Sequence, residues 1–142
     1  MDIDKLNADF AVLADKINEL DDLDYSDERY DDLEEELHDL EDEFLEEFGN
    51  SLEKAIAQVH DEFCPDTDVL LPTAYFAKNY IRLQKDHKGR HSYDVEYGEG
   101  VPVEVDAFGG QEVRLVLVPG PARLLVTVGD SAKQEAWRAR KS

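Results

Sequence analysis

Apolar side chains recur at alternating steps of three and four residues in two stretches near the start of the chain. The first stretch consists of Ile3, Leu6, Phe10, Leu13, Ile17 and Leu20, and the second consists of Tyr30, Leu33, Leu37, Leu40 and Phe44. This spacing places each set on one narrow stripe of an α-helix, as in a coiled-coil seam. The pattern therefore predicts one helix over about residues 2–22 and a second over about residues 27–48.

The segment between the two seams decides how these helices are joined. Ser26, followed by Asp27 and Glu28, is typical of a helix start and places a tight connection at residues 23–26. We therefore expect an antiparallel helical hairpin. Because no glycine or proline enforces the turn, one long helix through residues 21–28 is the alternative.

A third helix is expected directly after the second. Gly49 is a natural left-handed cap, so the second helix should end there. Asn50 and Glu53 then form a variant of the capping box that opens a further helix, which ends before Pro65. The apolar face of this third helix consists of Leu52, Ile56, Val59 and Phe63.

From residue 79 onward the apolar pattern has mostly a period of two, which is typical of strands. Candidate strands lie at residues 79–85, 92–97, 101–106, 112–118 and 122–128, with glycine-containing turns between them. Residues 73–78 fit either a helical turn or a strand. The short spacings predict a small antiparallel sheet or barrel, and Ser131, Gln134 and Trp137 predict a short C-terminal helix over residues 131–140. The expected fold class is α+β, with acidic helices in residues 1–64 and a β domain in residues 73–142.

Negative charge is concentrated in the first half of the chain. Residues 1–68 hold 26 Asp and Glu and 4 Lys and Arg, whereas residues 69–142 hold 9 acidic and 11 basic residues, for a total formal charge of −20. This asymmetry suggests two modules with different surfaces. The sign argues against direct binding of nucleic-acid phosphates or anionic lipids by the first half.

The second predicted helix is poorly balanced by its own charges. Pairs such as Asp39 and Glu43, or Asp42 and Glu46, put like charges four residues apart, and each such pair costs about 0.2–0.5 kcal/mol in an isolated helix. Solvation alone is the simplest use of such charge. We expect instead that a basic protein surface binds it, through Asp31, Asp32, Glu35, Asp39, Glu41, Asp42, Glu43, Glu46 and Glu47. The acidic hairpin tip would consist of Asp21, Asp22, Asp24, Asp27 and Glu28.

The chain also contains basic residues that could neutralise these acids, within one molecule or in a neighbouring subunit. One group is Lys78, Arg82, Lys85, Lys88 and Arg90 on a predicted hairpin, and another is Arg138, Arg140 and Lys141. Self-neutralisation is therefore the alternative to an external partner.

No catalytic motif, cofactor motif or complete metal site is recognised. Glu35 and His38 have the helical spacing of di-iron bundles, but no second such pair exists. Cys64, the single cysteine, is expected in the core rather than as a nucleophile beside His60. The lack of a disulfide framework, a secretory signal and a long apolar stretch predicts a cytoplasmic protein that does not enter a membrane.

Two resemblances concern the acidic helices. The stretch from Ser26 to Leu33, continuing to Leu37, Leu40 and Glu41, is similar to the helix-opening motif in the N-terminal domain of NAD-dependent DNA ligases, although the chain has no Lys-x-Asp-Gly nucleotidyl site. An acidic-tipped hairpin followed by a β domain resembles transcript-cleavage factors of the Gre type. That resemblance implies a regulator that reaches into RNA polymerase with Asp21, Asp22, Asp24, Asp27 and Glu28 at its tip.

Three functional hypotheses follow. The first is a non-enzymatic module that binds a basic protein partner, as an inhibitor or immunity protein, a chaperone or a nucleic-acid mimic does. The second is a structural protein that self-associates as a homodimer through the helical region. The third is the Gre-like regulator of RNA polymerase.

Overall fold

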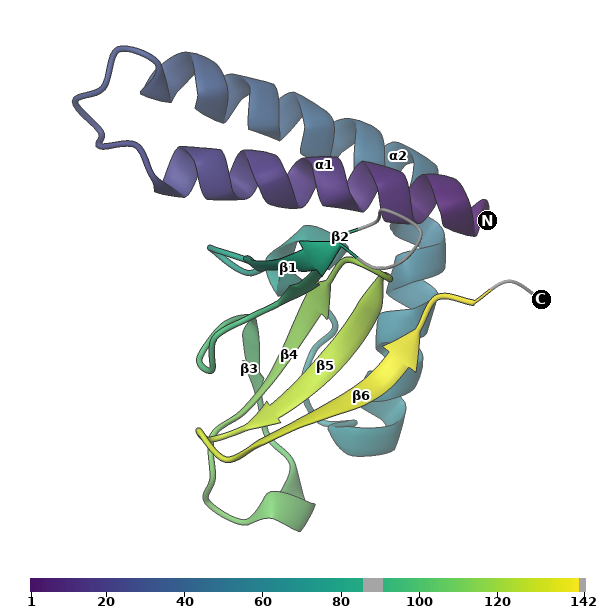
Figure 1. Ribbon diagram of the computed structural model, residues 1–142. Coiled ribbons are helices and arrows are strands. Elements are labelled where there is room, and N and C mark those ends of the chain that lie inside the picture. The colour runs from purple at the N-terminus through teal and green to yellow at the C-terminus, as the bar shows by residue number, and fades with distance from the viewer. Residues whose placement is uncertain (86–90, 141–142) are drawn as a thin grey trace.

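The computed structural model describes residues 1–85 and 91–140 and has a mixed α+β architecture (Figure 1). The helices are α1 (Ile3–Asp21) and α2 (Tyr30–Phe63), with 3₁₀ helices η1 (Pro72–Tyr75) and η2 (Asp106–Phe108). The strands are β1 (Ile81–Lys85), β2 (His91–Asp94), β3 (Val101–Val103), β4 (Val113–Val118), β5 (Arg123–Val128) and β6 (Ala132–Arg138). The mixed α+β class is thus confirmed. Among the described residues, no helix combines the length and the apolarity that a membrane span requires.

The antiparallel hairpin formed by α1 and the first half of α2 agrees with the prediction, and the single long helix does not occur. The carboxylate of Asp2 caps α1 by accepting a hydrogen bond from the Lys5 amide at 3.1 Å. Helix α2 begins at Tyr30, three residues later than predicted, because Asp27 stabilises the turn instead. The Asp27 carboxylate accepts from the Arg29 amide at 2.9 Å and pairs with the Arg29 guanidinium at 3.2 Å.

The predicted third helix is wrong, because α2 continues without interruption through Gly49 to Phe63. Gly49 has no positive φ and so does not act as a left-handed cap. The apolar face of α2 runs past it, and Phe48, Leu52 and Ile56 are all buried. This continuous burial outweighs the low helix propensity of one glycine. Figure 1 shows the first half of α2 beside α1 and its second half beside the larger sheet.

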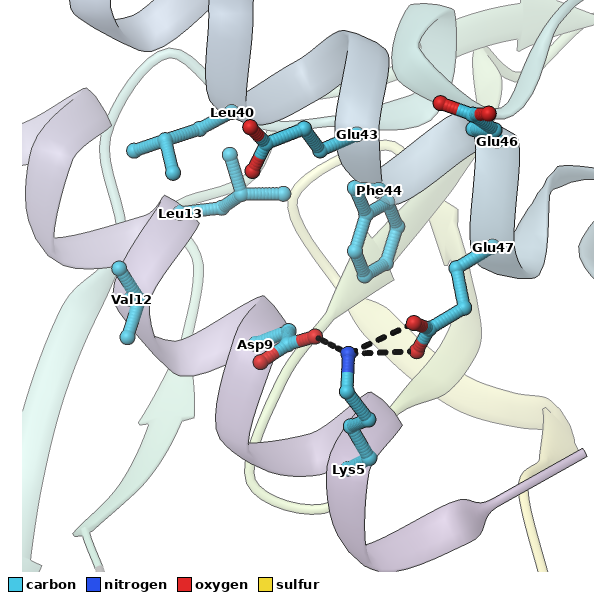
Figure 2. A pocket seen from close by; sticks show the side chains of 9 residues that line it. All are labelled: Lys5, Asp9, Val12, Leu13, Leu40, Glu43, Phe44, Glu46 and Glu47. Carbon is cyan, nitrogen blue, oxygen red and sulfur yellow. Dashed lines mark hydrogen bonds and ion pairs between the residues drawn. The ribbon is translucent and has the colours of Figure 1, made fainter.

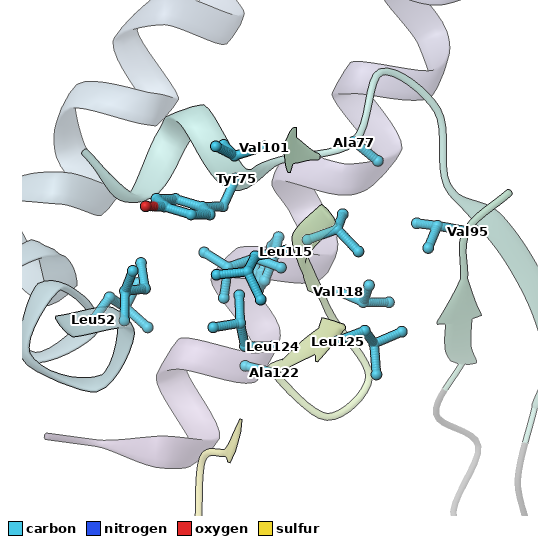
Figure 3. Close-up of a cluster of buried hydrophobic side chains, with 14 of the residues drawn as sticks. Leu52, Tyr75, Ala77, Val95, Val101, Leu115, Val118, Ala122, Leu124 and Leu125 are labelled. Atoms are coloured by element: carbon cyan, nitrogen blue, oxygen red, sulfur yellow. The ribbon is translucent and has the colours of Figure 1, made fainter. Parts of the chain in front are cut away.

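The β region forms a two-stranded sheet, β1-β2, and a four-stranded antiparallel sheet in the order β3-β4-β5-β6. The larger sheet is open, so the barrel alternative is wrong. The five predicted strand positions are occupied, and β4 and β5 are the most buried strands, as expected. Figure 3 shows apolar side chains on both faces of this sheet, with Leu115 and Leu124 near Leu52 and Val118 and Leu125 toward Val95. Residues 73–78 combine both interpretations, since η1 is followed by a parallel bridge between Phe76 and Leu117.

The predicted C-terminal helix over residues 131–140 is also wrong. Ser131 lies in the turn after β5, where its amide donates to the Val128 carbonyl at 3.1 Å, and β6 follows directly. Strand β5 is central, so the polar backbone groups of its outer edge need a partner strand. Glycine at position 129, with φ of 51°, permits the tight turn that supplies this partner.

Aromatic rings and one asparagine fix the hairpin to the β region. The Phe10 ring of α1 lies 5.6 Å from Phe44 of α2, 5.3 Å from Phe76 and 6.2 Å from Tyr80, measured between ring centroids. The Asn18 side chain donates to the Tyr80 carbonyl at 2.9 Å and accepts from the Tyr80 amide at 2.7 Å. The hairpin therefore has a defined orientation on the β region.

We expect Gly49→Ala to stabilise the protein. A Cβ atom at this position would meet only Leu45 carbons at 3.6–3.7 Å, which is ordinary van der Waals contact. Alanine is favoured over glycine inside a helix by about 0.5–1 kcal/mol. Urea unfolding should show this increase in the free energy of unfolding. A decrease would mean that α2 needs a glycine here.

Asn18→Ala should destabilise the protein, because two partly buried backbone groups of Tyr80 lose their partner. The expected loss is roughly 1–3 kcal/mol in the free energy of unfolding. Asn50→Ala is the matched control, since Asn50 is an exposed helical asparagine with no side-chain hydrogen bond among the described residues. Equal effects of the two substitutions in urea unfolding would contradict this role of Asn18.

Candidate functional site

The acids predicted to bind a partner lie on the hairpin half of α2. Of the nine, only Glu41 is partly buried, and the other side chains are exposed. Within the described residues, only Glu47 of this set forms an ion pair, with the Lys5 ammonium of α1 at 2.7 Å. Most of the predicted binding surface is therefore both accessible and without a cation of its own.

The basic residues that might neutralise α2 within the chain lie elsewhere, as far as they are described. Among the described residues, Lys78, Arg82 and Lys85 make no ion pair with an acid of α2, and Arg138 pairs with Glu135 at 2.6 Å. Lys88, Arg90 and Lys141 lie outside the described residues.

The tip acids do not converge on one point. Asp21 accepts a hydrogen bond from the Asn79 side-chain amide at 3.1 Å, and Asp27 is held by Arg29. Asp22, Asp24 and Glu28 are exposed and form no ion pair within the described part of the chain. Residues 1–85 and 91–140 contain no group of three or more His, Cys, Asp or Glu side chains that could hold a metal ion.

His60 and Cys64 have structural surroundings at the end of α2. The two ring nitrogens of His60 lie 2.9 Å from the Thr67 carbonyl oxygen and 2.8 Å from the Tyr75 hydroxyl. Cys64 is buried, and burial raises the pKa of its thiol above the ordinary value. This raised pKa keeps the group in its less reactive protonated form.

A groove of about 600 Å³ lies between α1 and the first half of α2 (Figure 2). Figure 2 shows Leu13, Leu40 and Phe44 between the two helix ribbons. Phe44 and Leu13 belong to the core, whereas Val12 on the α1 side is 49% exposed. Four acidic side chains also line the groove: Asp9, Glu43, Glu46 and Glu47.

Two lysines of α1 form ion pairs with glutamates of α2. The Lys5 ammonium lies 2.9 Å from Asp9 and 2.7 Å from Glu47, and the Lys16 ammonium lies 3.0 Å from Glu36. Hydrogen bonds to Glu47 and then Asp9 raise the pKa of Lys5 above its ordinary value. Because these side chains are exposed or partly exposed, each pair contributes little to the free energy of unfolding.

Among the described residues, no cation lies in the groove between these two ion pairs. Each helix contributes one row of side chains at steps of four, three and four residues. The α1 row is Lys5, Asp9, Val12 and Lys16, and the α2 row is Glu36, Leu40, Glu43 and Glu47. Lysine faces glutamate at both ends of these rows. In the middle, Asp9 and Val12 lie on the α1 side, so Glu43 has no ion-pair partner among the described residues.

Sequence reasoning identified the acids but missed the groove. It treated α1 as a source of seam residues and gave no role to Lys5, Val12 or Lys16. The signal was present in the spacing, because these positions flank the apolar stripe at 6, 10, 13 and 17. In a coiled coil, such flanking positions carry the charge pairs between helices.

Comparison of the chain with protein-family models, with curated proteins and with solved structures finds no match. Function is therefore inferred from the residues and their geometry.

Glu41 provides a test of the charge balance on α2. Burial, with a smaller effect of the Asp42 charge, raises the pKa of its carboxyl group, and His38 opposes this shift. A carboxyl group whose pKa is higher in the folded state destabilises the fold when it is ionised. Glu41→Gln should therefore raise the melting temperature by a few degrees at pH 7, and this gain should disappear as the pH falls below the ordinary value near 4.5.

The control for this measurement is Glu104→Gln, which changes the charge at an exposed position outside the helices. Thermal unfolding followed by circular dichroism at several pH values compares the two variants. A gain for Glu41→Gln that is the same at pH 7 and at acid pH would contradict the role of burial.

Proposed function

We propose that this chain is a non-enzymatic interaction module whose acidic hairpin binds a basic surface of a partner protein. The observation that supports this proposal is the exposure of eight of the nine predicted α2 acids, of which only Glu47 forms an ion pair among the described residues. Like charges at this density destabilise the free helix. A partner that brings lysine and arginine to them relieves the repulsion on contact.

The distribution of charge favours rapid encounter with such a partner. The formal charge of −20 arises entirely from the first half of the chain, which contains the hairpin. The electrostatic potential is therefore most negative around this half. Fields of this kind raise association rates with oppositely charged proteins, and they do so less as salt increases.

The hairpin is also suited to present its acids in fixed positions. The contacts of Phe10 and Asn18 tie α1 to the β region, and the Lys5 and Lys16 ion pairs align α1 with α2. A preorganised surface loses less conformational entropy on binding than a flexible acidic tail.

The two alternative hypotheses draw on the same helices. Self-association through the seams would have to expose Leu6, Phe10 and Phe44, which are buried within one chain. The Gre-like hypothesis rests on the outline of a hairpin with an acidic tip. The acidic surface of α2 is the feature that remains available without opening the core.

Neutralising part of the acidic surface should stabilise the free protein while weakening the complex. The variant carries amides at four exposed positions, Asp39, Asp42, Glu43 and Glu46. Removal of their like-charge pairs should raise the free energy of unfolding by about 1–2 kcal/mol. The control variant carries amides at Glu62, Asp66, Glu104 and Asp106, which are exposed and give the same change in net charge.

Affinity capture tests the binding itself. The immobilised protein is incubated with a lysate of its source cells, and bound proteins are eluted by salt and identified. We expect basic proteins that the wild type and the control variant retain and that the hairpin variant loses. Retention of the same proteins by both variants, or capture of no basic protein, would overturn the proposed function.

A further inference from the structure

The groove between α1 and α2 indicates which kind of basic segment of the partner binds there. We propose that this groove receives an amphipathic basic helix of the partner, which places an apolar side chain on Val12 and Leu40 and a lysine or arginine beside Glu43. This inference rests on the proposed function, because it names the part of the partner that the acidic hairpin binds.

The apolar part of the proposal rests on Val12. A purely electrostatic surface has no need of an apolar side chain between acids, yet Val12 is 49% exposed and lies in the groove with Leu40. Its neighbours Leu13 and Phe44 are buried and form the floor of the groove. An apolar side chain that covers this position is removed from water together with it, which adds binding energy that salt does not screen.

The charged part of the proposal rests on Glu43 in the middle of the groove. Lys5 shows the geometry with which the two helices hold an ammonium group, since Asp9 of α1 and Glu47 of α2 contact it together (Figure 2). Glu43 lies one helical turn before Glu47 and has no such partner among the described residues. A cation from another molecule would complete this row of ion pairs.

The spacing along the groove fits a helix as the occupant. Side chains on one face of a helix recur about every 6 Å along its axis, which is also the rise between Glu43 and Glu47 on α2. Lys5 and Lys16 are separated by about 16 Å along α1, so about three helical turns of a partner fit between the two closing ion pairs. Helix-in-groove binding of this kind uses apolar anchors three and four residues apart.

The experiment uses two synthetic peptides of roughly 18 residues made of lysine and leucine, labelled with a fluorophore. In the first peptide the leucines form one helical stripe flanked by lysines. In the second the same residues are scrambled so that no stripe exists. Fluorescence anisotropy with the full chain, at about 0.15 M and about 0.5 M salt, measures both affinities.

We expect the amphipathic peptide to bind about tenfold more tightly than the scrambled one and to retain more of its affinity at the higher salt concentration. Val12→Ser should weaken its binding about fivefold and leave the scrambled peptide unaffected. Val69→Ser is the matched control, because Val69 is 43% exposed and lies outside the groove. Amide chemical shifts should change around Val12 and Leu40 when the amphipathic peptide is added.

The outcomes separate this inference from the proposed function. If Glu43→Gln with Glu46→Gln weakens both peptides while Val12→Ser changes neither, the groove is not the site and the acidic surface still is. Equal affinity of the two peptides leads to the same conclusion. If neither peptide binds at the lower salt concentration, both proposals are overturned. Circular dichroism of each variant shows that a lost affinity does not come from unfolding.

Discussion

The packing of Phe10 against Phe44, Phe76 and Tyr80 is the constraint on which the rest of the structure depends. These four rings come from α1, α2 and the segment before β1. The centroid of Phe10 lies 5.3–6.2 Å from those of the other three rings, and the centroids of Phe44 and Phe76 lie 6.0 Å apart. Tilted and edge-on aromatic pairs contribute burial together with a preferred geometry. This cluster therefore joins the helices to the β region and also sets their orientation. Together with the unbroken course of α2, it fixes the direction of the acidic surface relative to the sheet.

The charge of α2 is tolerated because burial is stronger than repulsion. Each large apolar side chain contributes about 1.5–3 kcal/mol when it is fully buried, whereas each like-charge pair at a spacing of four costs only about 0.2–0.5 kcal/mol. Leu33, Leu37 and Phe44 are buried on the hairpin half of α2, so the fold persists despite the surrounding acids. Stability and surface charge are thereby separated on one helix. The inner face determines the fold, and the outer face is free to serve binding.

The sequence predicted those features that depend on local pattern. The two seams, the hairpin and the β strands followed from apolar spacing, and the negative half followed from counting charges. Gly49 misled the prediction because its cost in a helix is small beside the burial of Phe48 and Leu52, which only the tertiary packing reveals. Strand β6 was missed because its polar sequence gives little signal, and β5 selects it through backbone hydrogen bonds. The groove depends on which residues of two helices face each other, a long-range property that no local pattern contains.

The continuity of α2 has a mechanical consequence. At 1.5 Å per residue, its 34 residues follow a path of about 51 Å, and the helix changes direction between the portion beside α1 and the portion beside the sheet (Figure 1). The helix is continuous, so no loop acts as a joint between these portions. A load applied to the hairpin is therefore transmitted to the β region as a torque instead of being absorbed between them. A molecule bound to the hairpin is therefore held in a fixed direction relative to the β region, as by a bracket rather than by a flexible tether.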